Sequence, residues 1–284
     1  MFDKVLIANR GEIASRVIGT LDRMGIASVA VYSDADAASP YVRQAGEAVH
    51  IGGSAVKESY LRIDAIIAAA QATGAQAIHP GYGLLSENPE FVAACEAAGL
   101  VFIGPGSEAM RVMGSKIGSR IAMQAAGVPV VPGTTEPIAD REVARRAAAE
   151  IGYPVAVKAS AAGGGKGFRV AQGPDDRDAA IDGASGEGER LFGDGSVYLE
   201  RYLENPRHIE VQILADAYGH VIHLFERDCS VQRRHQKLVE EAPAPMVSPE
   251  LRERIGEIAV QAAKSVGYVS AGTAGGDALR RYAL

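Results

Sequence analysis

Cysteine, tryptophan and positive charge are all scarce in this sequence. Its 284 residues include two cysteines and no tryptophan, aromatic residues make up 6%, and the formal net charge is −6. Two cysteines are too few for a disulfide framework or a four-cysteine zinc site, so we expect a reducing, cytoplasmic compartment. Nucleic acid is not expected as the main ligand, because phosphate neutralisation needs clustered Lys and Arg beside stacking rings.

Long hydrophobic runs are missing as well. The Ala- and Ile-rich stretch at 63–78 is interrupted by Asp64 and Gly74, well short of the roughly 20 apolar residues of a membrane span. The first apolar run, residues 5–8, is shorter than the core of a signal peptide. We therefore expect no membrane partner and no secretion. Hydrophobic residues still make up 47% of the chain, which is typical of a globular protein.

Short β-branched runs alternate with helical patterns over residues 1–113. This alternation predicts a parallel sheet covered by helices, as in Rossmann-like α/β domains. The turn at 9–14 lacks the three spaced glycines of a dinucleotide fingerprint, so the sequence does not favour NAD. The expected strands are 5–8, 28–33, 48–51, 77–79 and 101–103, and the expected helices are 12–24, 60–72 and 89–97.

A Gly- and Pro-rich segment at 127–133 marks a domain boundary after a helix expected at 116–126. The expected elements beyond it are helix 140–151, strands 154–160 and 168–171, helix 175–191, strands 197–203, 207–214 and 220–227, a charged loop at 228–245, and a helix at 248–266. In the strand at 207–214, apolar residues alternate with His208, Glu210 and Gln212. One face of that strand should be buried and the other polar.

The glycine-rich segment at 160–168 is the strongest local signal. Consecutive glycines let the backbone approach a ligand and direct its N–H groups at phosphate oxygens. Lys166 is followed by Gly167 rather than Ser or Thr, and a strand comes next, so this is not a Walker A loop. We expect a hairpin flap over a triphosphate, with a plain flexible turn as the alternative.

Two basic positions could accompany that flap. Lys158 lies on an otherwise apolar strand, where its ammonium could neutralise phosphate oxygens; a surface lysine is the alternative. His235 and Lys237 are two residues apart, so in an extended segment they project to the same side. They could meet a phosphoryl group and a small anion, with His235 handling a proton. A solvated charged face is the alternative.

Motifs spread over residues 1–273 resemble biotin carboxylase, the ATP-grasp component of acetyl-, propionyl- and pyruvate-type carboxylases. They are Ile-Ala-Asn-Arg-Gly-Glu-Ile-Ala at 7–14, His-Pro-Gly-Tyr-Gly at 79–83, Leu-Ser-Glu-Asn at 85–88, Phe-Ile-Gly-Pro at 102–105, Met-Gly-Ser-Lys at 113–116, the glycine loop, Glu-Asn-Pro-Arg-His at 204–208, and 226–245. The last of these is the most specific. The resemblance implies a Rossmann-like parallel-sheet N-terminal domain at 1–114, a linker helix at 115–130, an ATP-grasp lid at 131–203 and an ATP-grasp body from 204.

The same resemblance assigns site residues by position. It implies phosphate contacts from Lys116 and Lys158, backbone contacts from Gly164 and Gly165, an adenine-holding hinge at Glu200, Arg201, Tyr202 and Leu203, nucleotide contacts from His208 and His235, and bicarbonate binding by Lys237. His235 and Lys237 are the implied catalytic pair.

The resemblance also implies a reaction and its partners. ATP with magnesium phosphorylates bicarbonate to carboxyphosphate, CO₂ is released, and N1 of biotin on a carrier protein is carboxylated. A carboxyltransferase component would use the carboxybiotin, as in the acyl-CoA carboxylases of fatty acid biosynthesis. Family members are homodimers. Because the ATP-grasp body of this chain is expected to be incomplete, the resemblance does not imply a homodimer here.

Similarity to the family stops after Thr273. The metal-binding glutamates of the family have no counterpart here, so no metal ligand is assigned, and the body at 204–284 is expected to be incomplete. We therefore expect weak ATP binding and no biotin carboxylation, with a non-catalytic nucleotide-binding chain as the alternative function. The apolar faces of Val211, Ile213 and Val221 are expected to be exposed. Within the flap, Ala162 stands where the family commonly has another glycine.

Overall fold

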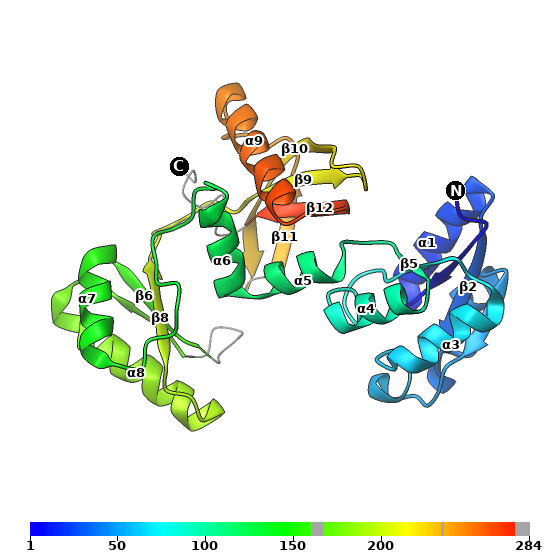
Figure 1. Ribbon diagram of the computed structural model, residues 1–284, viewed down its shortest axis with the longest axis horizontal. Coiled ribbons are helices and arrows are strands. Elements are labelled where there is room, and N and C mark those ends of the chain that lie inside the picture. The colour runs from blue at the N-terminus through cyan, green and yellow to red at the C-terminus, as the bar shows by residue number, and fades with distance from the viewer. Residues whose placement is uncertain (161–166, 234–235, 276–284) are drawn as a thin grey trace. The chain divides into compact units, whose positions relative to one another are not determined.

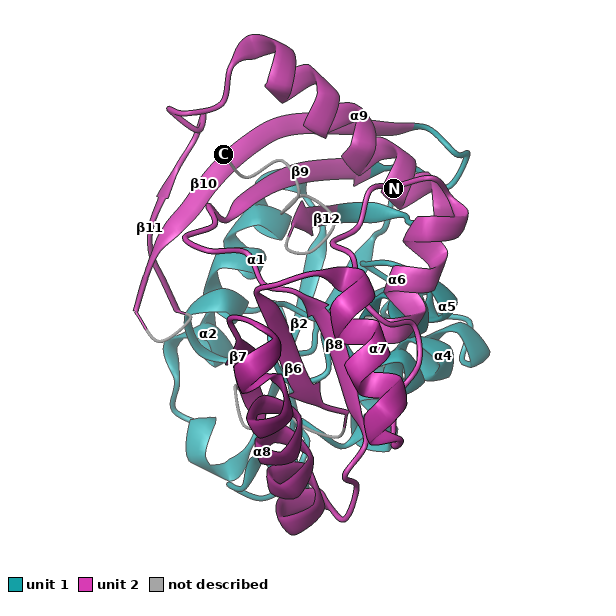
Figure 2. Cartoon of the chain, turned by 90° about the vertical axis from the view of Figure 1, so that its left-hand side faces the viewer, with its two compact units in different colours: residues 1–115, 215–220, 266–271 teal, residues 116–214, 221–265, 272–284 magenta. Residues whose placement is uncertain are grey.

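The computed structural model describes residues 1–160, 167–233 and 236–275, except for the side chain of Lys116. The chain forms two compact units, coloured teal and magenta in Figure 2. Unit 1 comprises residues 1–115, 215–220 and 266–271, and unit 2 comprises 116–214, 221–265 and 272–284. The predicted limits of the linker helix at 130 and of the ATP-grasp lid at 203 remain predictions.

Unit 1 contains a five-stranded parallel sheet with the order β3-β2-β1-β4-β5. Its strands are β1 (Lys4–Ile7), β2 (Ala27–Tyr32), β3 (Glu47–His50), β4 (Ala77–His79) and β5 (Val101–Phe102). Its helices are α1 (Gly11–Met24), α2 (Pro40–Gln44), α3 (Ile63–Thr73), α4 (Pro89–Ala97) and α5 (Ser107–Gly114). This arrangement confirms the predicted Rossmann-like α/β fold.

Both faces of this sheet are covered, because successive residues of a strand point to opposite sides. Leu6 packs into one hydrophobic cluster with Ile66 and Phe91, while Val5 joins a second cluster with Ile18. The buried strands therefore carry nearly continuous apolar runs, as expected for a parallel sheet between helices.

The ends of β1 and β4 are joined by Asn9. Its Nδ2 donates hydrogen bonds to the carbonyl oxygens of Pro80 (2.7 Å) and Tyr82 (2.8 Å). Gly81 between them has a φ of +67°, and an ideal Cβ there would lie 2.7 Å from that same nitrogen. Two of the motifs recognised in the sequence are thus one structural feature, located where the strand order reverses.

The start of the predicted helix at 60–72 is wrong, because Tyr60 belongs to a buried polar cluster instead. The Tyr60 hydroxyl donates to Asp36 Oδ2 at 2.6 Å, and α3 begins only at Ile63. Arg10 also donates to both oxygens of Asp36, at 2.7 and 2.8 Å. Chiefly through this bond from Arg10, and against the effect of burial, the pKa of Asp36 falls to about 2.

Replacing Asp36 by Asn should destabilise unit 1 in a pH-dependent way. Because the folded pKa lies below the ordinary 3.8, the carboxylate stabilises the fold above about pH 4 and this contribution disappears as pH falls toward 2. We expect Asp36→Asn to lower the free energy of unfolding by about 2 kcal/mol at pH 7. Urea titrations followed by circular dichroism would show the gap from wild type closing at low pH.

Asp34→Asn is the matched control for that experiment. The Asp34 side chain is 61% exposed and pairs with His50, whose side chain is 49% exposed, so its loss should cost less than about 1 kcal/mol. Equal losses in the two variants, or a gap that does not change with pH, would contradict the role given to Asp36.

Unit 2 begins with α6 (Lys116–Ala125) and contains an antiparallel sheet with the order β7-β6-β8. These strands are β6 (Val155–Ala159), β7 (Phe168–Ala171) and β8 (Val197–Arg201), and the helices beside them are α7 (Arg141–Ile151) and α8 (Pro174–Phe192). Their core includes Val155, Val157 and Leu199. Figure 1 shows the two helices, in green, lying along one face of the sheet.

A second sheet of unit 2 has the order β11-β10-β9-β12. It is formed by β9 (Ile209–Ala215), β10 (Val221–Arg233), β11 (Gln236–Glu241) and β12 (Ser270–Gly275), and α9 (Pro249–Ser265) packs against β10. The Arg252 guanidinium on α9 is held by the buried carboxylate of Glu226 on β10, at 2.8 to 3.0 Å. In the described part of the chain, no helix is long and apolar enough to cross a bilayer.

Two predictions for this sheet are wrong. The charged segment at 228–245 is not a loop, because β10 continues to Arg233 and β11 pairs with it antiparallel through a shifted register. All of β11 is exposed, so no apolar alternation marked it as a strand. Val211 and Ile213 are buried, at 0% and 3% exposure, because described parts of the chain already cover their face. Val221 is partly buried. The exposed large apolar side chains of this sheet include those of Ile222 and Leu224, each 53% exposed, and Leu238 on β11, 63% exposed.

Candidate active site

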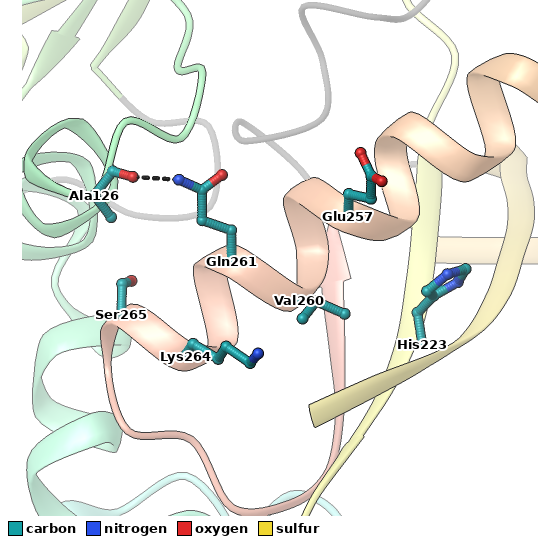
Figure 3. Close-up of a pocket in the computed structure, with 7 residues that line it drawn as sticks. All are labelled: Ala126, His223, Glu257, Val260, Gln261, Lys264 and Ser265. Atoms are coloured by element: carbon teal, nitrogen blue, oxygen red, sulfur yellow. Dashed lines mark hydrogen bonds between the residues drawn. The ribbon is translucent and has the colours of Figure 1, made fainter. Parts of the chain in front are cut away.

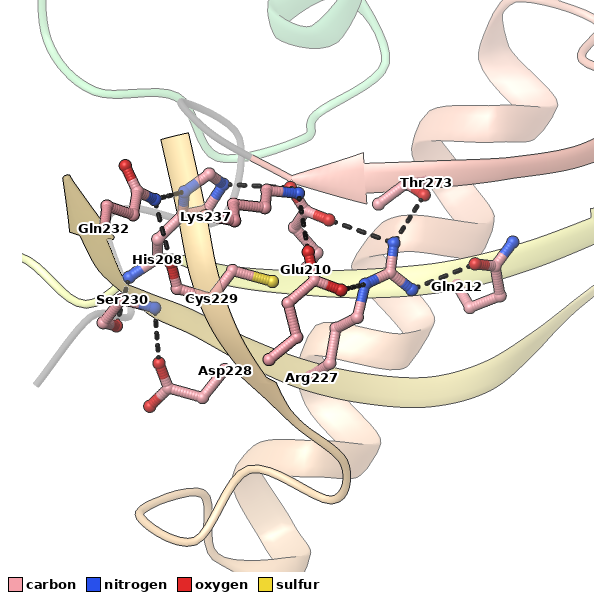
Figure 4. Close-up of polar contacts among 11 residues, drawn as sticks. His208, Glu210, Gln212, Arg227, Asp228, Cys229, Ser230, Gln232, Lys237 and Thr273 are labelled. Atoms are coloured by element: carbon pink, nitrogen blue, oxygen red, sulfur yellow. Dashed lines mark hydrogen bonds and ion pairs between the residues drawn. The ribbon is translucent and has the colours of Figure 1, made fainter. Parts of the chain in front are cut away.

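The polar face of β9 carries a carboxylate shared by three cationic or protonatable groups. Glu210 Oε1 lies 2.5 Å from Lys237 Nζ and 3.1 Å from His208 Nε2, while its Oε2 accepts a hydrogen bond from Arg227 at 3.0 Å. The Glu210 side chain is only 10% exposed. Figure 4 shows these side chains converging from β9, β10 and β11.

Arg227 fixes the position of this carboxylate. Besides Glu210, its guanidinium donates to Gln212 Oε1 at 3.0 Å and to Thr273 Oγ1 at 2.9 Å, and it lies 3.8 Å from Glu240. Because a planar guanidinium has donors in fixed directions, these contacts orient it between β9, β12 and the end of β11. The two carboxylates, Glu210 and Glu240, balance the charges of Arg227 and Lys237.

The charges in this cluster stabilise one another. Burial alone would raise the pKa of Glu210, but the hydrogen bond from Lys237 and the nearby cations outweigh it and lower that pKa. Burial likewise acts to lower the pKa of Lys237, and the bond to Glu210 reverses this and raises it. Lys237 therefore stays an ammonium at neutral pH, as an anion-binding group must.

His208 is held in one tautomer by Gln232. The Gln232 Nε2 lies 2.7 Å from His208 Nδ1 and donates its other hydrogen to the Cys229 carbonyl at 2.8 Å, which fixes the orientation of the amide. Since an amide nitrogen only donates, Nδ1 is the acceptor and the ring proton is assigned to Nε2, facing Glu210. The backbone N–H of His208 also donates to Ser230 Oγ at 2.9 Å.

A second acidic side chain is shared in the same manner near β6 and β8. The Lys158 ammonium donates to Glu200 Oε1, and Arg120 on α6 donates to Glu200 Oε2 at 3.3 Å. Lys158 also lies 5.8 Å from the centre of the Phe168 ring. Its side chain remains 23% exposed, so the ammonium can reach a ligand as well as Glu200.

The predicted hinge residues lie at the end of β8 and directly after it. The Arg201 N–H donates to the Pro132 carbonyl and the Tyr202 N–H to the Pro154 carbonyl, at 2.8 and 2.9 Å. A hollow of about 240 Å³ is lined by Pro154 and by residues 201–206, which include Leu203. These residues therefore border a space that part of a small ligand could enter.

Another hollow, of about 520 Å³, is lined by Ala126 after α6 and by residues of α9 and β10 (Figure 3). Glu257, Lys264 and Gln261 of α9 face it, and the Gln261 amide donates to the Ala126 carbonyl at 2.5 Å. None of the described residues that the sequence pointed to lines this hollow, so it is not taken as the candidate site.

The structure thus brings His208 and Lys237 together through Glu210, and Lys158 together with Glu200. Lys116 is the first residue of α6. Gly164, Gly165 and His235 lie outside the described residues, as does the side chain of Lys116.

Three residues of these clusters were missed by the sequence interpretation: Glu210, Arg227 and Arg120. Glu210 was detectable in part, because it follows His208 by two positions on the predicted polar face. Arg227 lies in the family motif at 226–245 but was given no role there. Arg120 gave no local signal, since Glu200 is 80 positions away.

Replacing Glu210 by Gln should free the Lys237 amine. Removing the carboxylate removes the main cause of the raised pKa of Lys237, so a larger fraction of the amine is neutral and reactive at any pH below about 10.4. We expect faster acetylation of Lys237 by acetic anhydride in Glu210→Gln, measured by mass spectrometry. Glu240→Gln is the control and should change the rate less, because Glu240 is 3.7 Å from Lys237 and 44% exposed. A larger effect at Glu240 would contradict this assignment.

Two family models match this chain. Residues 1–110 match the biotin carboxylase N-terminal domain, and residues 115–275 match the ATP-binding domain of the carbamoyl-phosphate synthase L chain. The chain is 57% identical over 273 residues to biotin carboxylase 2 of Bacillus subtilis, covering 96% of this chain and 62% of that protein. It is 55% identical over 273 residues to biotin carboxylase of Halalkalibacterium halodurans, covering 96% and 60%.

Solved structures agree with these sequence matches. A biotin carboxylase complex with an ATP ligand from Campylobacter jejuni is 50% identical with a TM-score of 0.86, covering 96% of this chain and 61% of that one. The biotin carboxylase domain of a thermophilic 2-oxoglutarate carboxylase, bound to bicarbonate, is 47% identical with a TM-score of 0.89, covering 97% and 60%. This chain spans about 60% of the length of these relatives, and it belongs to the biotin carboxylase family.

Proposed function

We propose that this chain binds ATP and bicarbonate and carries the ATP-grasp part of a biotin carboxylase. The observation that supports this most is the Lys237 ammonium, which Glu210 holds charged beside His208 on an accessible strand. With a side chain 33% exposed, Lys237 can exchange one contact with Glu210 for an anion.

The proposed residue roles follow the family positions. The proposed contacts are Lys116 and Lys158 with phosphate oxygens, Gly164 and Gly165 with phosphates through their N–H groups, Glu200, Arg201, Tyr202 and Leu203 with adenine, His208 and His235 with the nucleotide, and Lys237 with bicarbonate. The lysines act as point charges that neutralise oxyanions.

The proposed reaction transfers the γ-phosphoryl group of ATP to a bicarbonate oxygen, which forms carboxyphosphate and ADP. Carboxyphosphate then breaks into CO₂ and phosphate. N1 of biotin gives its proton to that phosphate and forms a bond to the carbon of CO₂. Charge accumulates on the transferred phosphoryl oxygens, so Lys158 and Lys237 would stabilise the two reactants while they are held in line. His235 is proposed to handle a proton.

Magnesium belongs to the family chemistry, since a solved relative holds it with ADP. Among residues 1–160, 167–233 and 236–275, no three His, Cys, Asp or Glu side chains gather where they could hold a metal ion. The carboxylates near the candidate site are already paired with Lys and Arg. These residues do not fit a magnesium site, and none of the steps proposed for this chain depends on one.

Partners are proposed by the same family argument. A biotin carboxyl carrier protein would present biotin, a carboxyltransferase would use the product, and the location would be the cytoplasm. A crystal structure of one relative describes its biotin carboxylase domain as a dimer. For this chain, the proposed domain limits are 1–114, 115–130, 131–203 and 204–284.

Two lysine variants test the proposal. Lys158→Ala should weaken ATP binding by about 1 to 3 kcal/mol, because it removes a charge-assisted contact with phosphate. Lys237→Ala should leave ATP binding nearly unchanged and remove the dependence of ATP hydrolysis on bicarbonate. Isothermal titration with ATP and a phosphate-release assay with bicarbonate and free biotin give the two readouts.

The outcomes of these assays separate the candidate functions. ATP binding without bicarbonate-dependent turnover would support a nucleotide-binding chain without carboxylase activity. Equal loss of ATP binding in both variants would misplace Lys237, and no binding of ATP by the wild type would refute the proposed function. Lys264→Ala is a suitable control, because Lys264 lines the separate hollow beside α9.

A further inference from the structure

Arg120 joins the two chain segments that connect the β6-β7-β8 sheet to the rest of unit 2. Its Nη1 donates to the carbonyl of Val131 and its Nη2 to Glu200 Oε2 at 3.3 Å. The side chains of Arg120 and Glu200 are only 10% and 9% exposed. A guanidinium can make both bonds at once because its donors point in fixed, separate directions.

The two segments run side by side where Arg120 meets them. Gly133 bridges Glu200 in antiparallel fashion, and the Thr134 N–H donates to the Leu199 carbonyl at 2.8 Å. An ideal Cβ on Gly133 would lie 2.7 Å from the Leu199 carbonyl and 3.1 Å from Arg120 Nη1. The guanidinium therefore rests directly over a position where only glycine leaves enough room.

Glu200 connects Arg120 to Lys158. One carboxylate oxygen accepts from the arginine and the other from the lysine. With Arg120 in place, the negative charge of Glu200 is divided between two cations, and one net positive charge remains for a ligand. Without Arg120, both oxygens of Glu200 can turn to Lys158, and the ammonium would be neutralised by the carboxylate of the neighbouring strand.

We propose that Arg120 is a positioning residue that keeps the Lys158 ammonium available to phosphate by occupying one oxygen of Glu200, so that the carboxylate does not bind the ammonium through both oxygens. The proposal rests on the nucleotide-binding function proposed above. It requires that Arg120 act through Glu200, so its effect should disappear when Glu200 loses its charge.

The test compares Arg120→Met, Glu200→Gln and the double variant by isothermal titration with ATP and with adenosine. We expect Arg120→Met to weaken ATP binding about five- to tenfold and to weaken adenosine binding much less, since only ATP has phosphates for Lys158. In the Glu200→Gln background, the same arginine change should have no effect. Arg120→Lys should recover part of the affinity, because one ammonium can reach only one of the two acceptors.

Arg141→Met is the matched control. Arg141 lies on α7, its side chain is 47% exposed, and it pairs with Asp182, so its loss should change neither affinity. The proposal would be overturned if Arg120→Met weakened ATP and adenosine binding equally, and did so in the Glu200→Gln background as well. Arg120 would then only support packing. Unchanged ATP binding in Arg120→Met would overturn it as well.

The acetylation rate of Lys158 tests the positioning role of Arg120 without nucleotide, and so independently of the proposed ATP binding. In the unliganded chain, Arg120→Met should slow acetylation of Lys158 by acetic anhydride several-fold, because Glu200 then holds the ammonium more tightly. The double variant should acetylate as fast as Glu200→Gln alone. If the wild type bound no ATP, the proposed function would fail, and this rate would still decide the positioning role: an unchanged rate in Arg120→Met overturns it.

Discussion

The geometry of the candidate site depends on the buried carboxylate of Glu210. A carboxylate that is nine-tenths buried loses most of its hydration, and it can stay ionised only with charged or hydrogen-bonding partners around it. Lys237 on β11, Arg227 on β10 and His208 directly before β9 supply those partners. Their pairing with one acid fixes how β9, β10 and β11 align, and it also sets the charge state of the lysine that faces solvent.

Buried carboxylates shared by an arginine and a second donor recur in the described part of the chain, and three of them differ in that second donor. Asp36, Glu200 and Glu210 are each largely buried, and each is shared by an arginine and a second donor. In unit 1 the second donor is the neutral hydroxyl of Tyr60, and the result is a stable fold contact. In unit 2 the second donor is a partly exposed lysine, so the acid holds a cation that can still change partners. The exposure of that second donor therefore separates the buried contact in unit 1 from the two clusters in unit 2.

Elements with one buried, apolar side could be predicted from the spacing of their apolar residues. Elements made mostly of exposed or charged residues could not, because they lack that spacing. The strand at 77–79 and the helix at 89–97 were predicted to the residue, because apolar residues mark their buried sides. β11 was missed since every one of its residues is exposed. Lys158 and Lys237 were singled out from strand pattern and spacing, and His208 from a family motif, whereas Arg120 lies 80 positions from Glu200, the partner that gives it a role. No local pattern encodes such a contact.

The bonds from Asn9 to the loop after β4 have a consequence for how this sequence can change. An ideal Cβ at Gly81 would overlap the Asn9 amide, and the φ of +67° already disfavours other residues there. A larger residue at position 81 would displace that amide and leave the carbonyls of Pro80 and Tyr82 without their donor. Positions 9 and 81 are therefore expected to change together. A residue with a side chain can replace Gly81 only if Asn9 is replaced at the same time.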